Sequence, residues 1–238
     1  MSGHSHFAGI KHKKAAQDAK RANVFTKVAR IVTLAAKEGG GNPDMNFKLR
    51  LAVDQARAVN MPKDNIDRAI KRGTGELKDQ AVIEEVVYEA LAFGNIAMLI
   101  KAATDNKNRT ISELKGVFAK NNAKLVPARS LAHLFKNVGV IYVDTAEKDA
   151  DEIELAAIEA GAIDTSFQAE ILQAYTDPRD LREIKDNLEK KGISVESAGL
   201  IFIPLSPVAI DRETQIDYEN FLEKLDELDD VQEVYDNL

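Results

Sequence analysis

The sequence predicts an α+β protein of several domains, with an N-terminal basic helical domain followed by two α+β domains of ferredoxin-like type, one inserted in the other. Three observations indicate this class. The chain of 238 residues is long enough for two or three domains. Apolar residues recur at helical spacing up to about residue 75, whereas short β-branched runs alternate with helical stretches from about residue 82. The net charge changes sign between these two parts.

The first domain is expected to contain four helices. They are predicted at residues 8–21, from residue 23 to the glycines at 39–41, at residues 46–59, and from residue 62 to residue 73. Asn23 is interpreted as the cap of the second helix. Three successive glycines end that helix, because glycine is unfavourable in a helix interior. Pro62 suits a first helical turn and Gly73 a C-terminal stop.

The remainder alternates short strands with helices. Strands are predicted at residues 82–90, 96–103, 130–135, 138–143, 165–169, 171–176, 195–203 and 231–235. Helices are predicted at residues 110–121, 150–160, 178–190 and 213–228, the first from the capping-box spacing of Thr110 and Glu113. Residues 138–203 complete one split β-α-β unit. We therefore expect a helical domain over 1–76, a middle α+β domain over 80–136 with 206–238, and an inserted ferredoxin-like domain over 137–205.

Charge is distributed unevenly between the two parts of the chain. Residues 1–75 contain 15 Lys or Arg and 6 Asp or Glu, which gives a charge of +9. Residues 76–238 contain 17 basic and 33 acidic residues, which gives −16 and a total of −7. Two solvated surfaces would be the simplest explanation. Because the charge switches at an apparent domain boundary, we favour a polyanionic partner for the first domain.

Composition excludes several classes of site. The chain has no cysteine, so disulfides, cysteine-ligated metals and a thiol nucleophile are absent. No apolar run approaches the roughly 18 residues of a spanning helix, and no apolar signal segment precedes the basic residues. His4, His6 and His12 have no carboxylate or cysteine at ligand spacing. We expect a cytoplasmic protein that is not an enzyme, does not contact a membrane and needs no cofactor or metal.

Thirteen cations of the first domain form the predicted nucleic-acid-binding surface. They are Lys11, Lys13, Lys14, Lys20, Arg21, Lys27, Arg30, Arg50, Arg57, Lys63, Arg68, Lys71 and Arg72. Phosphates recur about every 3.4 Å along each strand of a duplex, so an elongated row of long cations suits a nucleic-acid backbone. A solvated helix face is the alternative. Promoter DNA and ribosomal RNA both remain possible partners, because phosphate contacts carry no sequence information.

Two further charged segments have competing interpretations. Lys107 and Arg109 lie between a strand and a helix, where they would form an anion site beside the helix N-terminus. Turn and capping chemistry alone would explain the residues around them. The acidic end lacks the spacing of a calcium loop and is interpreted as a solvated face that repels nucleic acid. Its members are Glu223, Asp226, Glu227, Asp229, Asp230 and Glu233.

Several motifs resemble the YebC/PmpR family. The most specific is the opening block, Gly3-His4-Ser5 followed by Ile10-Lys11-His12-Lys13-Lys14-Ala15-Ala16-Gln17-Asp18-Ala19-Lys20-Arg21 and Phe25-Thr26-Lys27. Similar motifs stand at residues 39–43, 60–64, 68–73, 104–110 and 229–235. The chain departs from the family pattern at Phe7, where Trp is usual, and at the turn of residues 92–95. It also lacks the family's glycines within residues 121–129, which puts a ligand contact in the middle domain in doubt.

The resemblance implies a three-domain regulator of gene expression that is not a catalyst. Bacterial members of the family are described as transcriptional regulators that bind promoter DNA. Others are mitochondrial translational activators, and some bacterial relatives act at the ribosome on stalling proline-rich nascent chains. A nucleic-acid-binding transcriptional regulator is therefore our first hypothesis. A ribosome-associated translation factor or adaptor, acting through ribosomal RNA and protein contacts, is the alternative.

Overall fold

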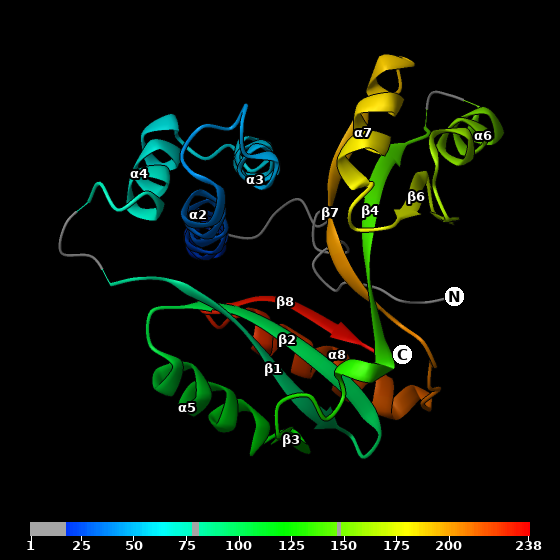
Figure 1. Ribbon diagram of the computed structural model, residues 1–238. Helices are drawn as coiled ribbons and strands as arrows, with labels where there is room; N and C mark the ends of the chain where they lie inside the picture. The colour runs from blue at the N-terminus through cyan, green and yellow to red at the C-terminus, as the bar shows by residue number, and fades with distance from the viewer. Residues whose placement is uncertain (1–17, 78–80, 147–148) are drawn as a thin grey trace. The chain divides into compact units, whose positions relative to one another are not determined.

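The computed structural model describes residues 18–77, 81–146 and 149–238, with side chains from residue 22 onward (Figure 1). Two compact units are present. Residues up to 136 together with 203–238 form the first unit, and residues 137–202 form the second. The first unit holds both the helices of the N-terminal part and a four-stranded sheet. The α+β class predicted from the sequence is confirmed.

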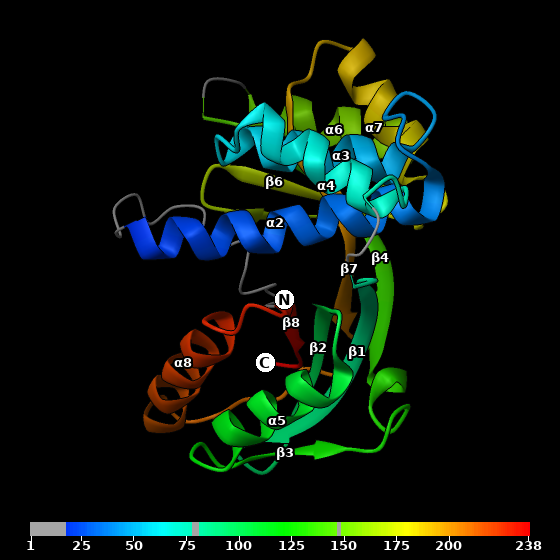
Figure 2. The same ribbon diagram turned by 90° about the vertical axis from the view of Figure 1, so that its left-hand side faces the viewer.

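Three helices pack together in the N-terminal part of the first unit. They are α2 (Asp18–Gly39), α3 (Phe47–Ala58) and α4 (Lys63–Gly73). Both α3 and α4 lie on the same side of α2 (Figure 2). Val28, Val32 and Ala35 form the buried stripe of α2, at the spacing of a helix that buries one face. This stripe packs with Leu49 of α3 and Ile66 of α4 in one apolar core.

One predicted helix start is wrong. Asn23 lies inside α2 and does not cap a helix. Its side-chain Nδ2 donates to the carbonyl oxygens of Asp226 and Glu227, at 3.4 and 3.3 Å. The part of the expected first helix that precedes Asp18 lies outside the described residues. A sequence pattern cannot distinguish a polar residue that caps a helix from one that binds a distant segment, because both need a short side chain with hydrogen-bonding groups.

Gly73 allows α4 to approach α2 closely. A Cβ atom at this position would lie 2.3 Å from the carbonyl oxygen of Thr33 and 2.7 Å from Cβ of Ala36. We therefore expect Gly73→Ala to lower the free energy of unfolding by about 1–3 kcal/mol, the usual cost of overpacking. Gly116 of α5 is the matched control, since a Cβ there would meet nothing within 4 Å.

Gly116→Ala is expected to raise the free energy of unfolding by about 0.5–1 kcal/mol, because alanine is the better helix former. Urea denaturation of the two variants measures both changes. Equal effects of the two substitutions would contradict the close helix contact at Gly73.

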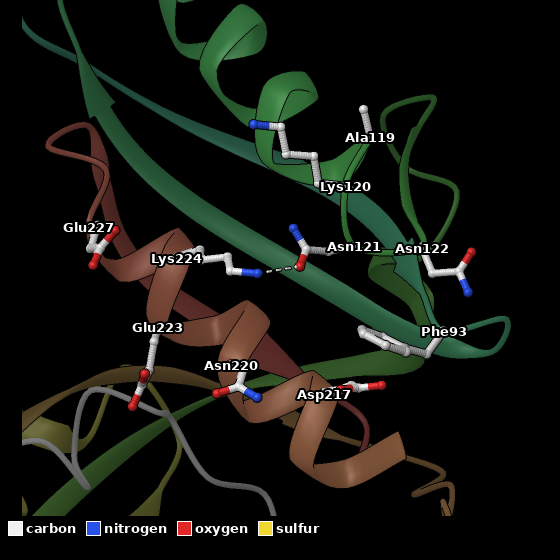
Figure 3. A pocket seen from close by; sticks show the side chains of 10 residues that line it. All are labelled: Phe93, Ala119, Lys120, Asn121, Asn122, Asp217, Asn220, Glu223, Lys224 and Glu227. Atoms are coloured by element: carbon white, nitrogen blue, oxygen red, sulfur yellow. Dashed lines mark hydrogen bonds between the residues drawn. The ribbon is translucent and has the colours of Figure 1, made fainter. Parts of the chain in front are cut away.

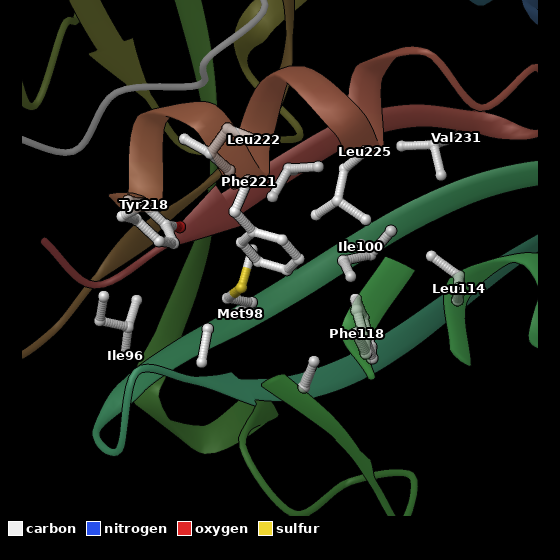
Figure 4. Packing of buried hydrophobic residues seen from close by; sticks show 13 residues of the cluster. Ile96, Met98, Ile100, Leu114, Phe118, Tyr218, Phe221, Leu222, Leu225 and Val231 are labelled. Carbon is white, nitrogen blue, oxygen red and sulfur yellow. The ribbon is translucent and has the colours of Figure 1, made fainter. Parts of the chain in front are cut away.

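The rest of the first unit is a four-stranded sheet in the order β3-β1-β2-β8. Its elements are β1 (Glu84–Ala92), β2 (Ile96–Thr104), α5 (Lys107–Phe118), β3 (Ala123–Val126), α8 (Arg212–Asp226) and β8 (Val231–Asp236). All three strand pairs are antiparallel. Side chains of α5 and α8 pack with the sheet in one apolar core (Figure 4). Its helical members Leu114, Tyr218, Phe221 and Leu225 are each at most 2% exposed.

The second unit has a sheet in the order β5-β6-β4-β7. Its elements are β4 (Phe135–Asp144), α6 (Ala150–Ala160), β5 (Asp164–Gln168), β6 (Ile171–Thr176), α7 (Leu181–Lys190) and β7 (Val195–Pro204). The chain order strand, helix, strand, strand, helix, strand is that of the split β-α-β unit expected from the sequence. Its first and third strands, β4 and β6, lie at the centre of the sheet.

The segment between β3 and β4 differs from the prediction. A strand was expected at residues 130–135, but turns and a short 3-10 helix, η1 (Ala132–Leu134), lead there into β4. The buried carboxylate of Glu89 accepts hydrogen bonds from the backbone N–H groups of Arg129 and Leu131. These N–H groups therefore donate to a side chain, whereas in a β-strand they would donate to carbonyl oxygens of a neighbouring strand. The short strand β3, which the sequence analysis missed, pairs with β1 instead.

Candidate nucleic-acid interface

Four predicted cations are exposed on α3 and α4. Arg57 ends α3 with a side chain that is 71% exposed and lies 3.4 Å from Asp54. Lys63, Arg68 and Lys71 of α4 are exposed and form no ion pair within the part of the chain that the structure describes. We call Arg57, Lys63, Arg68 and Lys71 the free-cation set, although Arg57 keeps its exposed contact with Asp54. They are available to an external anion.

Helix α4 also carries acidic residues on its exposed side. Asp64 and Asp67 are both exposed, and Asp67 stands one helical turn from Lys63 and one from Lys71. The surface is therefore of mixed charge, with cations in excess. Such a surface can attract a phosphate backbone, but the carboxylates weaken the local field.

Arg50 supports the loop between α2 and α3. Its Nε atom donates to the carbonyl oxygen of Pro43 at 3.3 Å, and its Nη2 atom donates to that of Asp44 at 3.2 Å. The same loop is fixed by Asn46, which accepts from the N–H of Leu49 and donates to the carbonyl oxygen of Ala35. Arg50 is partly buried and holds local structure, so we do not include it in the free-cation set.

Lys27 lies in the interior of the protein, although the sequence places it among the surface cations. The residue is 2% exposed, and its Nζ atom donates to the Asp226 carboxylate at 2.7 Å and to the Asp226 carbonyl oxygen. An ammonium group that is buried and paired in this way has no surface to offer to a phosphate. Lys27 instead joins α2 to the end of α8.

Arg30 contacts a buried carboxylate of the middle domain. Its Nη1 atom donates to a carboxylate oxygen of Asp230 and to the carbonyl oxygens of Ala103 and Asp229. Arg109 donates to both carboxylate oxygens of Asp230, at 2.8 and 2.9 Å. Asp230 itself is 1% exposed. One carboxylate thus binds guanidinium groups from α2 and from α5.

Two hydroxyl groups complete this arrangement, which we call the Asp230 cluster. Thr104 and Thr110 donate to the same carboxylate oxygen of Asp230, at 2.9 and 2.6 Å. Burial alone would raise the pKa of Asp230. Hydrogen bonds from Thr110, Arg109, Arg30 and Thr104 outweigh that effect and hold its pKa below the ordinary value.

The acidic end is therefore not a uniformly solvated face, which corrects the interpretation of its sequence. Asp226 and Asp230 bind cations of α2 within the same unit. Since these carboxylates neutralise Lys27 and Arg30, part of the positive charge of the helical domain is used inside the protein. The acidic end lies against the helical domain and not away from it.

Arg72 has different surroundings from Lys71, its neighbour in the sequence. Arg72 donates to the carbonyl oxygen of Ala81 at 3.0 Å and lies 3.8 Å from the Asp105 carboxylate. Its side chain is 29% exposed. We assign Arg72, with Lys27 and Arg30, to a locked-cation set that connects α2 and α4 to the rest of the first unit.

The predicted anion site at Lys107 and Arg109 is occupied by carboxylates of the protein. Lys107 lies 2.6 Å from Glu84, whose hydrogen bond raises the pKa of this lysine. Arg109 contacts Asp105 as well as Asp230. The helix N-terminus beside them is capped by the Asn106 side chain, which corrects the capping role expected for Thr110. Thr110 is buried and belongs to the Asp230 cluster.

Five of the predicted cations have side chains outside the part of the chain that the structure describes. Lys11, Lys13 and Lys14 lie outside the described residues, as do the side chains of Lys20 and Arg21. The residues that sequence reasoning missed are Asp230, Thr104, Thr110 and Asn23. Thr104, Thr110 and Asp230 lie within the motifs at residues 104–110 and 229–235, which were their sequence signal, whereas Asn23 had none.

The middle domain also has an open pocket of about 830 Å³ between the end of α5 and α8 (Figure 3). Phe93, Asn121 and Asn122 line one side, and residues of α8 line the other. Lys224 lies there but donates to Asn121 at 2.8 Å. Three acidic side chains, Asp217, Glu223 and Glu227, face the same space, so the pocket does not favour phosphate.

The described residues contain neither a metal-binding group nor a membrane-spanning helix. Among them no group of three or more His, Cys, Asp or Glu side chains is arranged to hold a metal ion. None of the helices found in this part of the chain is long and apolar enough to cross a membrane.

Comparison with known proteins identifies relatives along nearly the whole chain. A family model described as the TACO1/YebC protein N-terminal domain matches residues 5–76, and one described as the TACO1/YebC second and third domain matches residues 83–238. A protein of Thermotoga maritima named "Probable transcriptional regulatory protein" is 47% identical over 238 residues, which cover 100% of this chain and 93% of the relative.

A protein of Trichlorobacter lovleyi with the same name is 44% identical over 237 residues, covering 100% of this chain and 95% of the relative. The crystal structure of a conserved hypothetical protein from Aquifex aeolicus superposes with a TM-score of 0.89 at 44% identity. That match covers 98% of this chain and 96% of the other.

Proposed function

Because the chain belongs to the TACO1/YebC family, we propose that it regulates gene expression by binding nucleic acid through exposed cations of its helical domain. The observation that carries this proposal is the free-cation set, which has no intramolecular partner stronger than the Arg57–Asp54 contact at 3.4 Å among the described residues. The names of the relatives from Thermotoga and Trichlorobacter support a regulatory role in transcription.

The proposed surface combines the free-cation set with the cations near the N-terminus. These additional residues are Lys11, Lys13, Lys14, Lys20 and Arg21. The locked-cation set is left out, because carboxylates and carbonyl oxygens of the middle domain already bind Lys27, Arg30 and Arg72. Long flexible cations can follow a phosphate backbone and gain affinity by releasing its condensed counterions.

A ribosome-associated role in translation is the second candidate. It is supported by the kind of contact that α3 and α4 offer: charged side chains of short helices, with no exposed aromatic residue among the described residues of these two helices. Such contacts recognise phosphate, which ribosomal RNA presents as well as promoter DNA. The same cations would then position the protein on RNA.

The experiment that tests the proposal is recovery of nucleic acid with the native full-length protein, followed by sequencing of the bound DNA and RNA. We expect specific recovery that is lost when Lys63, Arg68 and Lys71 are replaced together by alanine. Promoter DNA in the recovered fraction would support transcriptional regulation, and ribosomal RNA would support the second candidate. Recovery that the triple variant leaves unchanged would contradict the proposed surface.

A further inference from the structure

The second unit exposes apolar side chains along one edge. Ile158 of α6 is 53% exposed, Ile163 in the following turn is 56% exposed, and Phe167 of β5 is 43% exposed. Single exposed apolar residues are common on protein surfaces and need no explanation. These three belong to consecutive elements, so their relative positions matter.

The register of β5 with β6 places Phe167 on the helix-covered face of the sheet. Phe167 lies opposite Leu172, and Thr165 lies opposite Ala174. Leu172 and Ala174 are 0% exposed and therefore point into the core beneath the helices. Directly opposed residues of a strand pair point to the same face, so Thr165 and Phe167 also point toward the helices.

A hydrogen bond fixes which side of α6 faces β5. The Thr165 hydroxyl donates to the Glu154 carboxylate of α6. Ile158 follows Glu154 by one helical turn, so it lies on this same side of α6. Because α6 and β5 run in opposite directions, Ile158 and Ile163 lie toward the start of β5, and Phe167 lies toward its end, on the same side of this contact. We call these three residues the apolar edge.

The backbone beside the apolar edge is available for pairing. Strand β5 is the terminal strand in the sheet order β5-β6-β4-β7, so the sheet pairs only one of its sides. An edge strand presents N–H and C=O groups that an extended segment of another chain can pair with. The apolar edge would give such a segment apolar contacts for alternate side chains.

The surroundings of this edge are strongly acidic. Residues 149–178 contain eight Asp or Glu and no Lys or Arg, and two of these carboxylates, Glu159 and Asp177, pair with Lys191 and Arg179. Asp164 and Glu170 are exposed at the two ends of the β5–β6 hairpin, and Asp151 is exposed on α6. A second copy of the chain would bring the same carboxylates and be repelled, as would a nucleic acid. The charge selects a cationic partner.

We propose that β5 and the apolar edge bind an extended protein segment in which Lys or Arg alternates with apolar residues. The segment adds a strand next to β5, places its apolar side chains against Ile158 and Phe167, and directs its cations to the surrounding carboxylates. This site is separate from the cations of the helical domain and does not depend on the nucleic-acid proposal.

The test uses full-length protein and a synthetic nine-residue peptide that alternates Lys and Val. The chain contains no tryptophan, so Phe167→Trp gives a single tryptophan at the site, which can be excited selectively above the absorption of tyrosine. We expect the peptide to shift the Trp emission to shorter wavelength. A Lys–Ser peptide should bind at least about tenfold more weakly, because it lacks the apolar side chains. A Glu–Val peptide should not bind.

Variants with the natural Phe167 are compared by the anisotropy of labelled peptide. Ile163→Ser, and separately Asp164→Asn with Glu170→Gln, should each weaken binding by about tenfold. Ile216→Ser is the control, since Ile216 of α8 is 55% exposed but lies in the other unit. Thermal melts establish that each variant is folded.

Three results would overturn the proposal. The Lys–Ser peptide could bind as tightly as the Lys–Val peptide, which would indicate charge attraction alone. Binding could be unchanged in both the Ile163 and the double carboxylate variants. Sedimentation could show a dimer that Ile163→Ser abolishes, which would make a second copy of the chain the occupant.

Discussion

Replacing Asp230 with alanine should lower the free energy of unfolding by about 3 kcal/mol, the size expected when one partner of a buried ion pair is removed. The substitution leaves Arg30 and Arg109 without their shared carboxylate, and Thr104 and Thr110 without an acceptor. Arg109 is 42% exposed and can be rehydrated, which limits the loss to the lower part of the usual range.

Asp229→Ala is the matched control for this prediction. Asp229 is exposed, and Arg30 contacts only its backbone carbonyl oxygen. Its replacement should change stability by less than about 0.5 kcal/mol, as most surface substitutions do. Urea denaturation of both variants at neutral pH measures the difference. If the two variants unfold at the same urea concentration, Asp230 does not hold the domains together.

The Asp230 cluster should also make stability depend on pH. The folded protein holds the pKa of Asp230 below its ordinary value of 3.8. A carboxyl group of this kind contributes its full stabilisation above the pKa that it has in the unfolded chain. The contribution decreases as the pH falls from there through the lower folded pKa. The stability difference between the wild type and Asp230→Ala should therefore be constant near neutral pH and shrink below about pH 4.

The second prediction separates cations that bind nucleic acid from cations that hold the fold. Replacing Lys63, Arg68 and Lys71 together by alanine should weaken binding while changing stability little, because all three are exposed. Lys27→Met should do the opposite. It removes the ion pair with Asp226 but keeps an apolar side chain in the buried position. We expect it to lower the free energy of unfolding by about 1–2 kcal/mol and to leave binding unchanged.

Much of the fold could be predicted because its signals are local. Helix α6 was predicted with its observed bounds, and Asn46 and Pro62 were placed correctly at the starts of α3 and α4. Strand β3 escaped prediction because it has only four residues. The resemblance to the YebC/PmpR family is confirmed by the family models and by relatives at 43–47% identity over the full chain.

The roles of individual charges could not be predicted in the same way. Lys27 and Lys71 are both helical cations, and composition gives no reason to distinguish them. The difference arises from contacts between segments about 200 residues apart: Lys27 meets Asp226, 199 residues later, and Arg30 meets Asp230, 200 residues later. A pattern that is read along the chain records neither contact, so Lys27 and Arg30 were both assigned to the surface.

The salt dependence of binding tests the central claim most directly. Full-length protein is titrated with labelled duplex DNA and with a labelled ribosomal RNA fragment, from low to physiological salt. If half to three quarters of the nine cations of the proposed surface meet phosphates, the slope of log K against log salt for the duplex should be about −4 to −6. The Lys63, Arg68 and Lys71 triple variant should reduce this slope by about 2–3 units on unrelated sequences, and Lys13→Ala with Lys14→Ala by about 1–2 units. Lys27→Met should retain the wild-type slope.

A flat salt dependence, or a triple variant with the slope of the wild type, would contradict nucleic-acid binding by the free-cation set.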